Sequence, residues 1–191
     1  MSYIFLVLQA NIFFLIDNSD ISLEIDVNSR CEATPLTSNG FGYVWHGAKA
    51  TYGFSYGRIW YEVTVVKHLE VPHLEAEEPH PHVIRVGWSI DNAGIILGEE
   101  EFSYGYGGTG MASTKLKFKK YGTTFKEGDV LGCFLDLEVE PIVMSFTVNG
   151  RHQGVCYEIP HSELKGQALF PHILTKNCSF KVIIMLSFAI I

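Results

Sequence analysis

Apolar and polar residues alternate along much of this chain, and a period of two predicts β-strands rather than helices. The clearest alternation is RIWYEVTVV at 58–66, which puts Ile59, Tyr61, Val63 and Val65 on one face of a strand. Further strands are expected at 21–27, 82–90, 130–137, 142–148, 154–159, 169–174 and 178–182. Many short strands with almost no helix predict an all-β fold, an antiparallel β-sandwich.

Turn residues separate these alternating runs. Asn149-Gly150 is the strongest hairpin signal, because a tight two-residue turn favours this pair. Other turns are expected at Gly47 and at 91–94. The segment 68–82 contains Pro72, Pro79 and Pro81 and is predicted to be a loop, since proline cannot pair within a central strand.

The stretch 85–137 organises the chain around a segment rich in glycine and tyrosine. It begins with an apolar run that carries Arg85 and Trp88, passes through the glycine-rich segment at 102–110, and ends in the apolar run at 130–137. The glycine-rich segment cannot be a helix. It is predicted to be a loop whose glycines let the backbone approach a partner closely.

Part of this segment, GYGGTG at 105–110, formally matches the phosphate-binding pattern GxGxxG. A dinucleotide site needs that pattern between a strand and a helix. The residues that follow, KLKFK at 115–119, alternate like a strand. The context therefore excludes the nucleotide interpretation, and no cofactor is expected.

The composition indicates a single folded domain. The chain has 191 residues, of which 47% are apolar and 18% charged, so it has enough apolar residues to build a core. The domain is expected at 17–182, between an irregular apolar N-terminal segment at 1–16 and a divergent apolar tail at 183–191. Both apolar ends are too short to span a bilayer as helices, and no membrane role is predicted.

Charge and cysteine content limit the partners and the compartment. A net charge of −7 argues against broad binding to a nucleic-acid backbone. The four cysteines, Cys31, Cys133, Cys156 and Cys178, show no CxxC pair. Cys133 and Cys156 lie in apolar strand-like runs and are expected to be free, buried and reduced, as in the nucleus or cytoplasm. A disulfide pairing stays open as an alternative.

The candidate catalytic and metal chemistry is weak. His68, His73, His80 and His82 could suggest zinc, but prolines and glutamates dominate the same segment, which favours a solvated loop. Neither a nucleophile motif nor an acid–base pair stands out, so no catalytic or metal residue is predicted. A lectin-like or hydrolytic sandwich would rest on fold analogy alone.

Four lysines form a candidate basic strip. Lys115, Lys117 and Lys119 are predicted to share one strand face, with Lys120 adjacent and Leu116 and Phe118 on the other face. The simpler interpretation is a solvated face that also discourages pairing between sheet edges. The alternative is a contact for RNA phosphate or an acidic peptide.

Arg85 is more informative, because it lies in the strand-like run HVIRVGW, where an unpaired buried charge would be costly. It must pair with an internal carboxylate or line a pocket, and its planar donors suit a carboxylate or phosphate ligand. Tyr104 and Tyr106 are two apart, should point the same way, and could form a contact wall. A structural arginine with tyrosines packed beside it remains the alternative.

At these residues the sequence resembles the SPRY domain, a concanavalin-like jelly-roll sandwich used for protein–protein recognition. The matching motifs are RIWYEVTV (58–65), RVGWS (85–89), LGEEEFSYGYGGTG (97–110), YGTTFKEGDVLGCFLD (121–136), SFTVNGRHQG (145–154) and ALFPHI (168–173). The variant is similar to that of the heterogeneous nuclear ribonucleoprotein U family, through WHGAKATYG (45–53), PHVIRVGWS (81–89) and QALFPHILTKNC (167–178). The SAP helices, Walker A sequence and RGG repeats of that family are not found in this sequence.

The resemblance implies a non-enzymatic, nuclear interaction module in an RNA-processing context, present as a monomer. Its peptide contacts are predicted at Arg85, Tyr104, Tyr106, Gly107 and Gly108, with the arginine meeting an acidic ligand. Direct RNA binding by the lysine strip is the alternative function, and Trp88 is expected in the core.

Overall fold

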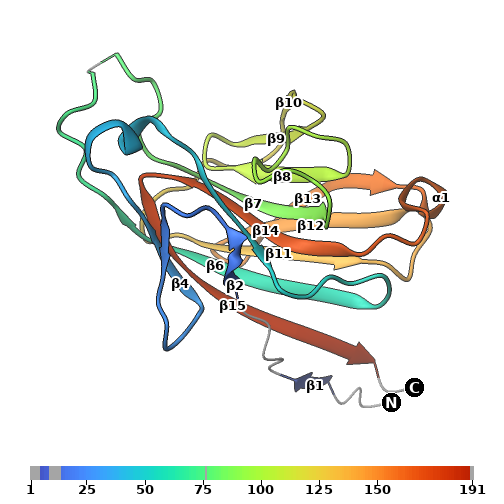
Figure 1. The fold of residues 1–191 in the computed structure, drawn as a ribbon. Helices are drawn as coiled ribbons and strands as arrows, with labels where there is room; N and C mark the ends of the chain where they lie inside the picture. Colours follow the sequence, from blue (N-terminus) through green and yellow to red (C-terminus); the bar gives the residue numbers. More distant parts are fainter. Residues whose placement is uncertain (1–4, 9–13, 76, 190–191) are drawn as a thin grey trace.

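The computed structural model describes residues 5–8, 14–75 and 77–189, and these form two antiparallel sheets packed face to face (Figure 1). Sheet A has the order β13 (Arg151–Ile159), β12 (Ile142–Val148), β11 (Val130–Asp136), β6 (Arg58–His68), β15 (Cys178–Ala189), β4 (Glu32–Pro35) and β3 (Leu23–Ile25), with β1 (Phe5–Leu8) also paired to β15. Sheet B has the order β10 (Lys117–Lys120), β9 (Met111–Thr114), β8 (Ser103–Gly107), β7 (Val83–Ile90), β14 (Leu169–Lys176), β5 (His46–Ala50) and β2 (Phe14–Ser19). A 3₁₀ turn, η1 (Asn39–Tyr43), and one helical turn, α1 (His161–Leu164), complete the described elements. The predicted sandwich is confirmed.

The core lies between the two sheets and follows the predicted alternation. Ile59, Tyr61, Val63 and Val65 of β6 all point inward and are buried. The ring of Tyr61 meets Trp88 of β7 edge-to-face at 5.1 Å, and Trp88 is fully buried as expected. Burial of apolar area between the sheets is the main force that holds the two layers together.

The Asn149-Gly150 hairpin is also confirmed. Asn149 and Gly150 have φ values of 51° and 75°, the left-handed conformation that a tight turn between twisted strands requires. Val148 and Arg151 face each other across this turn, which sets the register of β12 against β13.

Two local predictions were wrong. The strand expected at 21–27 is only β3, because residues 21–22 and 27 lie in turns at its two ends. Ile21 is 98% exposed and Val27 74%. Gly47 lies inside β5 rather than in a turn. A side chain at Gly47 would collide with the carbonyl of Ile95, so the glycine is needed for close approach of another segment.

The described parts of the apolar ends are strands of the two sheets. β15 continues through the predicted tail at 183–191 as far as Ala189, and its residues Ile183 to Ser187 pair with Glu62 to Arg58 of β6. The segment 1–16 contains β1 and the beginning of β2. Residues 1–4, 9–13 and 190–191 lie outside the described part of the chain.

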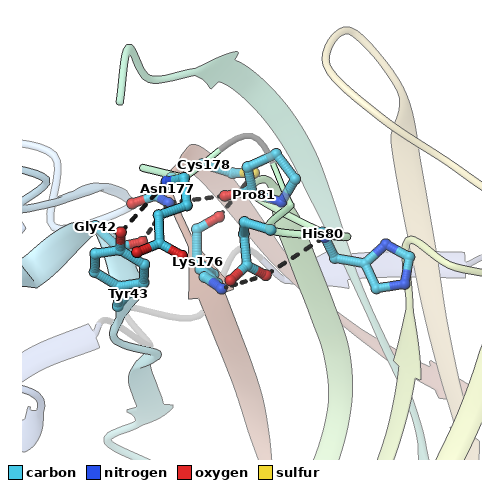
Figure 2. Close-up of polar contacts among 9 residues, drawn as sticks. Gly42, Tyr43, His80, Pro81, Lys176, Asn177 and Cys178 are labelled. Carbon is cyan, nitrogen blue, oxygen red and sulfur yellow. Dashed lines mark hydrogen bonds and ion pairs between the residues drawn. The ribbon is translucent and has the colours of Figure 1, made fainter. Parts of the chain in front are cut away.

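The predicted loop at 68–82 extends from one end of the sandwich and is fastened at its base (Figures 1 and 2). The amide of Asn177 donates to the carbonyls of Gly42 at 2.7 Å and Pro81 at 2.8 Å. Nζ of Lys176 lies 3.0 Å from the Glu78 carboxylate. Asn177 is fully buried, so these two hydrogen bonds hold the base of the loop from inside the fold.

Candidate peptide-binding site

The glycine-rich segment predicted as a loop is mostly strand β8, and this corrects the sequence interpretation. β8 lies between β7 and β9, so its alternate side chains Tyr104 and Tyr106 point inward between the sheets. Tyr104 packs edge-to-face on Tyr157 at 5.1 Å, and the hydroxyl of Tyr106 donates to the carbonyl of Thr123. Burial raises the pKa of both phenols above the ordinary value.

The two tyrosines therefore point the same way, as predicted, but into the core. Tyr104 is 6% exposed and Tyr106 is 0% exposed, so neither ring offers a contact wall to a partner. The strict alternation of SYGYG at 103–107 was the signal for a half-buried strand. The high glycine content of the segment suggests a loop, but the alternation of its side chains corresponds to the observed strand.

The glycines of β8 make room for Arg85 on the outer face of sheet B. Gly107 faces Arg85 across the β7–β8 pair, and a Cβ atom on Gly105 would lie 2.6 Å from Cδ of Arg85. Gly108 follows, half-buried, in the turn that leads to β9. The GxGxxG pattern thus joins two strands, as expected from its context.

Arg85 lies between two aromatic rings. Its guanidinium carbon is 5.4 Å from the ring centroid of Trp45 and 5.4 Å from that of Phe118. Nη1 donates to the carbonyl of Leu97, and in the described part of the chain no carboxylate lies within ion-pair distance of this side chain. Burial lowers the pKa of Arg85, and the nearby Glu99 opposes that shift.

Arg85 also belongs to a row of three side chains that fastens one loop onto sheet B. Nζ of Lys49 donates to the carbonyls of Asp91 at 2.6 Å and Ala93 at 2.5 Å. The Nε2 atom of His172 lies 3.0 Å from the carbonyl oxygen of Ile95, and Arg85 reaches the carbonyl of Leu97. Residues from three adjacent strands thus bind alternate carbonyls of 91–97.

The row gives Arg85 a backbone carbonyl as partner in place of the expected carboxylate, and a ligand contact by Arg85 stays a prediction. The arginine is structural, since it fixes the 91–97 loop. Of the two rings beside it, Phe118 is 53% exposed and Trp45 is half-buried. Sequence reasoning missed Trp45 and Phe118, whose approach to Arg85 depends on tertiary packing.

The lysines do not form the predicted strip. Lys115 and Leu116 have positive φ and make the turn between β9 and β10, where Nζ of Lys115 pairs with Glu101 at 2.6 Å. Nζ of Lys119 donates to the carbonyl of Cys156 at 2.7 Å and lies 5.1 Å from the Tyr157 ring centroid. Lys117 and Lys120 are exposed on the edge strand β10, without an ion pair or hydrogen bond to the described residues.

The histidines and cysteines have structural surroundings. His68 and His82 stack at 4.7 Å at the base of the 68–82 loop. Within 5–8, 14–75 and 77–189, no cluster of three or more His, Cys, Asp or Glu side chains could hold a metal ion, and no helix is long and apolar enough to cross a membrane. All four cysteines are free; Cys133 and Cys156 are buried as predicted, and Cys178 is buried too.

Comparison with known families decides the identity of this sandwich. A family model described as SPRY domain matches residues 58–187. The chain belongs to the SPRY domain family. This SPRY domain is 39% identical over 160 residues to heterogeneous nuclear ribonucleoprotein U-like protein 2 of mouse and of human, a match that covers 84% of the chain. It is 35% identical over 137 residues, 72% of the chain, to the ATP-dependent RNA helicase DDX1 of Xenopus laevis.

The match spans only 21% of the U-like proteins and 16% of the helicase. Among solved structures, the SPRY domain of human HERC1 superposes with a TM-score of 0.66 at 15% identity, covering 89% of this chain and 96% of that one. A human SPRY domain superposes with a TM-score of 0.62, covering 85% and 94%. At this identity the two structures show that the chain shares their fold.

Proposed function

We propose that this SPRY domain is a non-enzymatic module that binds a peptide segment of a partner protein on the outer face of sheet B. The contact region, here called the Arg85 site, consists of Arg85, Trp45, Phe118, Gly107 and Gly108. The observation that carries the proposal is the buried guanidinium held between two aromatic rings beside a surface turn.

The physical case rests on what the guanidinium can still bind. Arginine has five N–H donors in a planar fork, and in the described part of the chain only Nη1 has an acceptor, the carbonyl of Leu97. A peptide carboxylate could accept from the remaining donors in a region of low dielectric constant, where such bonds are strong. Phe118 would add an apolar wall. Tyr104 and Tyr106 support the site from below rather than contacting the ligand.

The relatives support a cellular setting for this proposal. Two are named as ribonucleoprotein U-like proteins and one as an RNA helicase. We place this SPRY domain in the nucleus, in an RNA-processing assembly, acting as a monomer. Direct RNA binding is the rival function. It rests on Lys117 and Lys120, since Lys115 and Lys119 already have protein partners.

A random 12-residue peptide display library, selected against the purified domain, tests the Arg85 site. The selected peptides should be enriched in Asp and Glu, because a carboxylate complements the guanidinium. In fluorescence anisotropy, Arg85→Gln and Phe118→Ala should each weaken binding at least tenfold, as expected for hot-spot residues. Leu116→Ala, on the adjacent turn, is the matched control and should change binding less than twofold.

Thermal unfolding of each variant separates loss of binding from loss of the 91–97 loop. Phe118→Ala is the decisive variant, since Phe118 is exposed and supports no loop. Selected peptides that bind it as tightly as the wild type would refute the site. A single-stranded RNA that binds more tightly than the non-specific range of ~10⁻⁴–10⁻⁶ M, and is released by Lys117→Ala with Lys120→Ala, would favour the rival.

A further inference from the structure

The outer face of sheet A carries a groove that the Arg85 site does not include. Its centre is formed by Trp60 of β6 and Phe134 of β11, which face each other in register. The two rings are nearly parallel, with centroids 5.8 Å apart and an interplanar angle of 12°. The groove has a volume of about 640 Å³ and is lined further by Val139, Val143, Ser145 and His152.

The two rings lie against the sheet rather than projecting from it. Adding a Cβ atom to Gly132 would bring it within 2.9 Å of the Phe134 ring, so the glycine leaves space for that ring to cover it. Trp60 and Phe134 are both half-buried. Alternation in β6 sends Tyr61 into the core and Trp60 outward, so these aromatic rings are not needed to fill the interior.

Acidic side chains surround the groove. Arg58 lies 3.0 Å from Asp136 and 3.3 Å from Glu138, and this trio carries a net negative charge. Glu62 and Glu158 have no ion pair or hydrogen bond with other described residues. The ring nitrogen Nδ1 of His152 accepts a hydrogen bond from the backbone N–H of Gly154 at 3.0 Å.

The strand register places the two uncompensated carboxylates just outside the lining of the groove, on opposite sides of it. Glu62 faces Gly132 across the β6–β11 pair, whereas Glu158 faces Val143 across the β12–β13 pair. With about 3.4 Å per residue along a strand and about 4.8 Å between strands, these positions are roughly 20 Å apart, on a diagonal that crosses the aromatic pair.

We propose that this groove binds a peptide segment of a protein partner that has bulky apolar residues in its centre and lysine or arginine at both ends. The apolar centre would cover Trp60, Phe134 and Val143, and the basic ends would reach Glu62 and Glu158. A span of roughly 20 Å corresponds to about six extended residues or about 13 helical ones. Charge complementarity selects this partner over its alternatives.

Other occupants fit the charges less well. Nucleic acid would bring phosphates against Glu62, Glu158 and the Arg58 trio. A symmetric second copy would place the same acidic rim against itself, and like charges across an interface are repulsive. The groove is thus complementary to a basic partner, whereas the Arg85 site is complementary to an acidic one.

Synthetic 16-residue peptides provide the test, each with the same central Leu-Phe-Leu-Ile-Phe sequence in a serine background and with two Lys, two Glu or two Ser at each end. Fluorescence anisotropy should show that the Lys-flanked peptide binds at least tenfold more tightly than the Glu-flanked peptide. Glu62→Gln with Glu158→Gln should weaken that binding fivefold or more, and Trp60→Ala tenfold or more. Glu24→Gln, an exposed carboxylate on β3, should change it less than twofold.

Several results would overturn the proposal. One is equal binding of the Lys-flanked and Glu-flanked peptides. Another is unchanged binding of the Lys-flanked peptide by the Glu62→Gln, Glu158→Gln double variant, whose two substitutions are on the surface and should leave the fold intact. The proposal would also be overturned if no peptide bound with a Kd below about 1 mM, the affinity of a very weak complex. A dimer seen by light scattering that Trp60→Ala dissociates would assign the groove to a second copy. Phe118→Ala should leave the groove unaffected, which separates this proposal from the Arg85 site.

Discussion

His172 is a buried histidine that makes two hydrogen bonds as an uncharged imidazole. Its Nδ1 atom lies 2.9 Å from the hydroxyl of Ser89, and its Nε2 atom lies 3.0 Å from the carbonyl oxygen of Ile95. Since a carbonyl can only accept, the proton is on Nε2, and Ser89 donates to Nδ1. Burial lowers the pKa of His172 to about 3, with Lys49 adding to the shift.

We predict that this imidazole makes stability fall in acid. Between the ordinary pKa of 6.5 and the folded value of about 3, the unfolded chain holds a proton that the folded chain excludes. The free energy of unfolding should therefore fall as the pH drops through this window, by up to about 1.4 kcal/mol per pH unit from this group. Urea unfolding between pH 4 and pH 8 measures the slope.

His172→Gln is expected to be less stable at pH 7 but to have a shallower pH dependence. His161→Gln is the matched control, because His161 is exposed on α1, and it should keep the slope of the wild type. His46 and His68, whose pKa values burial also lowers, contribute to the slope that remains in His172→Gln. An unchanged slope in that variant would contradict the assignment.

At the scale of elements, side chains protect the open edge of sheet A. β13 lies at one edge of this sheet. Two of its backbone carbonyls accept hydrogen bonds from side chains on β10 or directly after it. Nζ of Lys119 donates to Cys156, and the hydroxyl of Tyr121 donates to Gly154, both at 2.7 Å. Exposed edge strands invite pairing with other chains, so this cover protects against self-association.

Removing the cover should promote association. The double variant Lys119→Ala, Tyr121→Phe frees both β13 carbonyls while leaving most of the Tyr121 ring contacts in place. Light scattering at increasing concentration should show larger species than in the wild type. Lys120→Ala removes a neighbouring lysine that has no hydrogen-bond partner among the described residues, and it should remain like the wild type. Equal association of the two variants would mean that net charge, not edge protection, is responsible.

At the scale of the whole molecule, β15 ties together segments from both ends of the chain. It pairs with β6 in the centre of sheet A, with β4 and with β1. The apolar residues after Val182 therefore fill a sheet position rather than forming a free tail. Loss of this half of the strand would leave β6 with an unpaired edge from Arg58 to Glu62.

Deletion of 183–191 is accordingly predicted to destabilise the domain by several kcal/mol or to cause aggregation, because a long apolar edge would face solvent. Chemical unfolding of the soluble fraction and its yield measure the effect. A full-length variant with Ser187→Ala keeps the strand backbone and should match the wild type. A truncated domain of normal stability would show that β6 does not need this half of β15.

The candidate sites show which residues a sequence can identify and which it cannot. Arg85 could be singled out, because a charge inside an apolar run needs an explanation. Its partners Trp45, Leu97 and Phe118 come from three distant segments, and no local pattern connects them. The same limit applies to Glu62 and Glu158, whose positions around one groove follow from strand order.

By itself, the sequence determined the fold class, most strands, the 149–150 hairpin, the buried cysteines and the membership of the SPRY family. Each of these depends on local alternation, turn chemistry or contiguous motifs, which adjacent residues encode. Only the tertiary structure decided that β8 is an inner strand, that only 23–25 of the expected strand at 21–27 pairs in a sheet, and that Lys115 and Lys119 already have protein partners. Those outcomes depend on which strands become neighbours, and burial is a property of that arrangement rather than of any one segment.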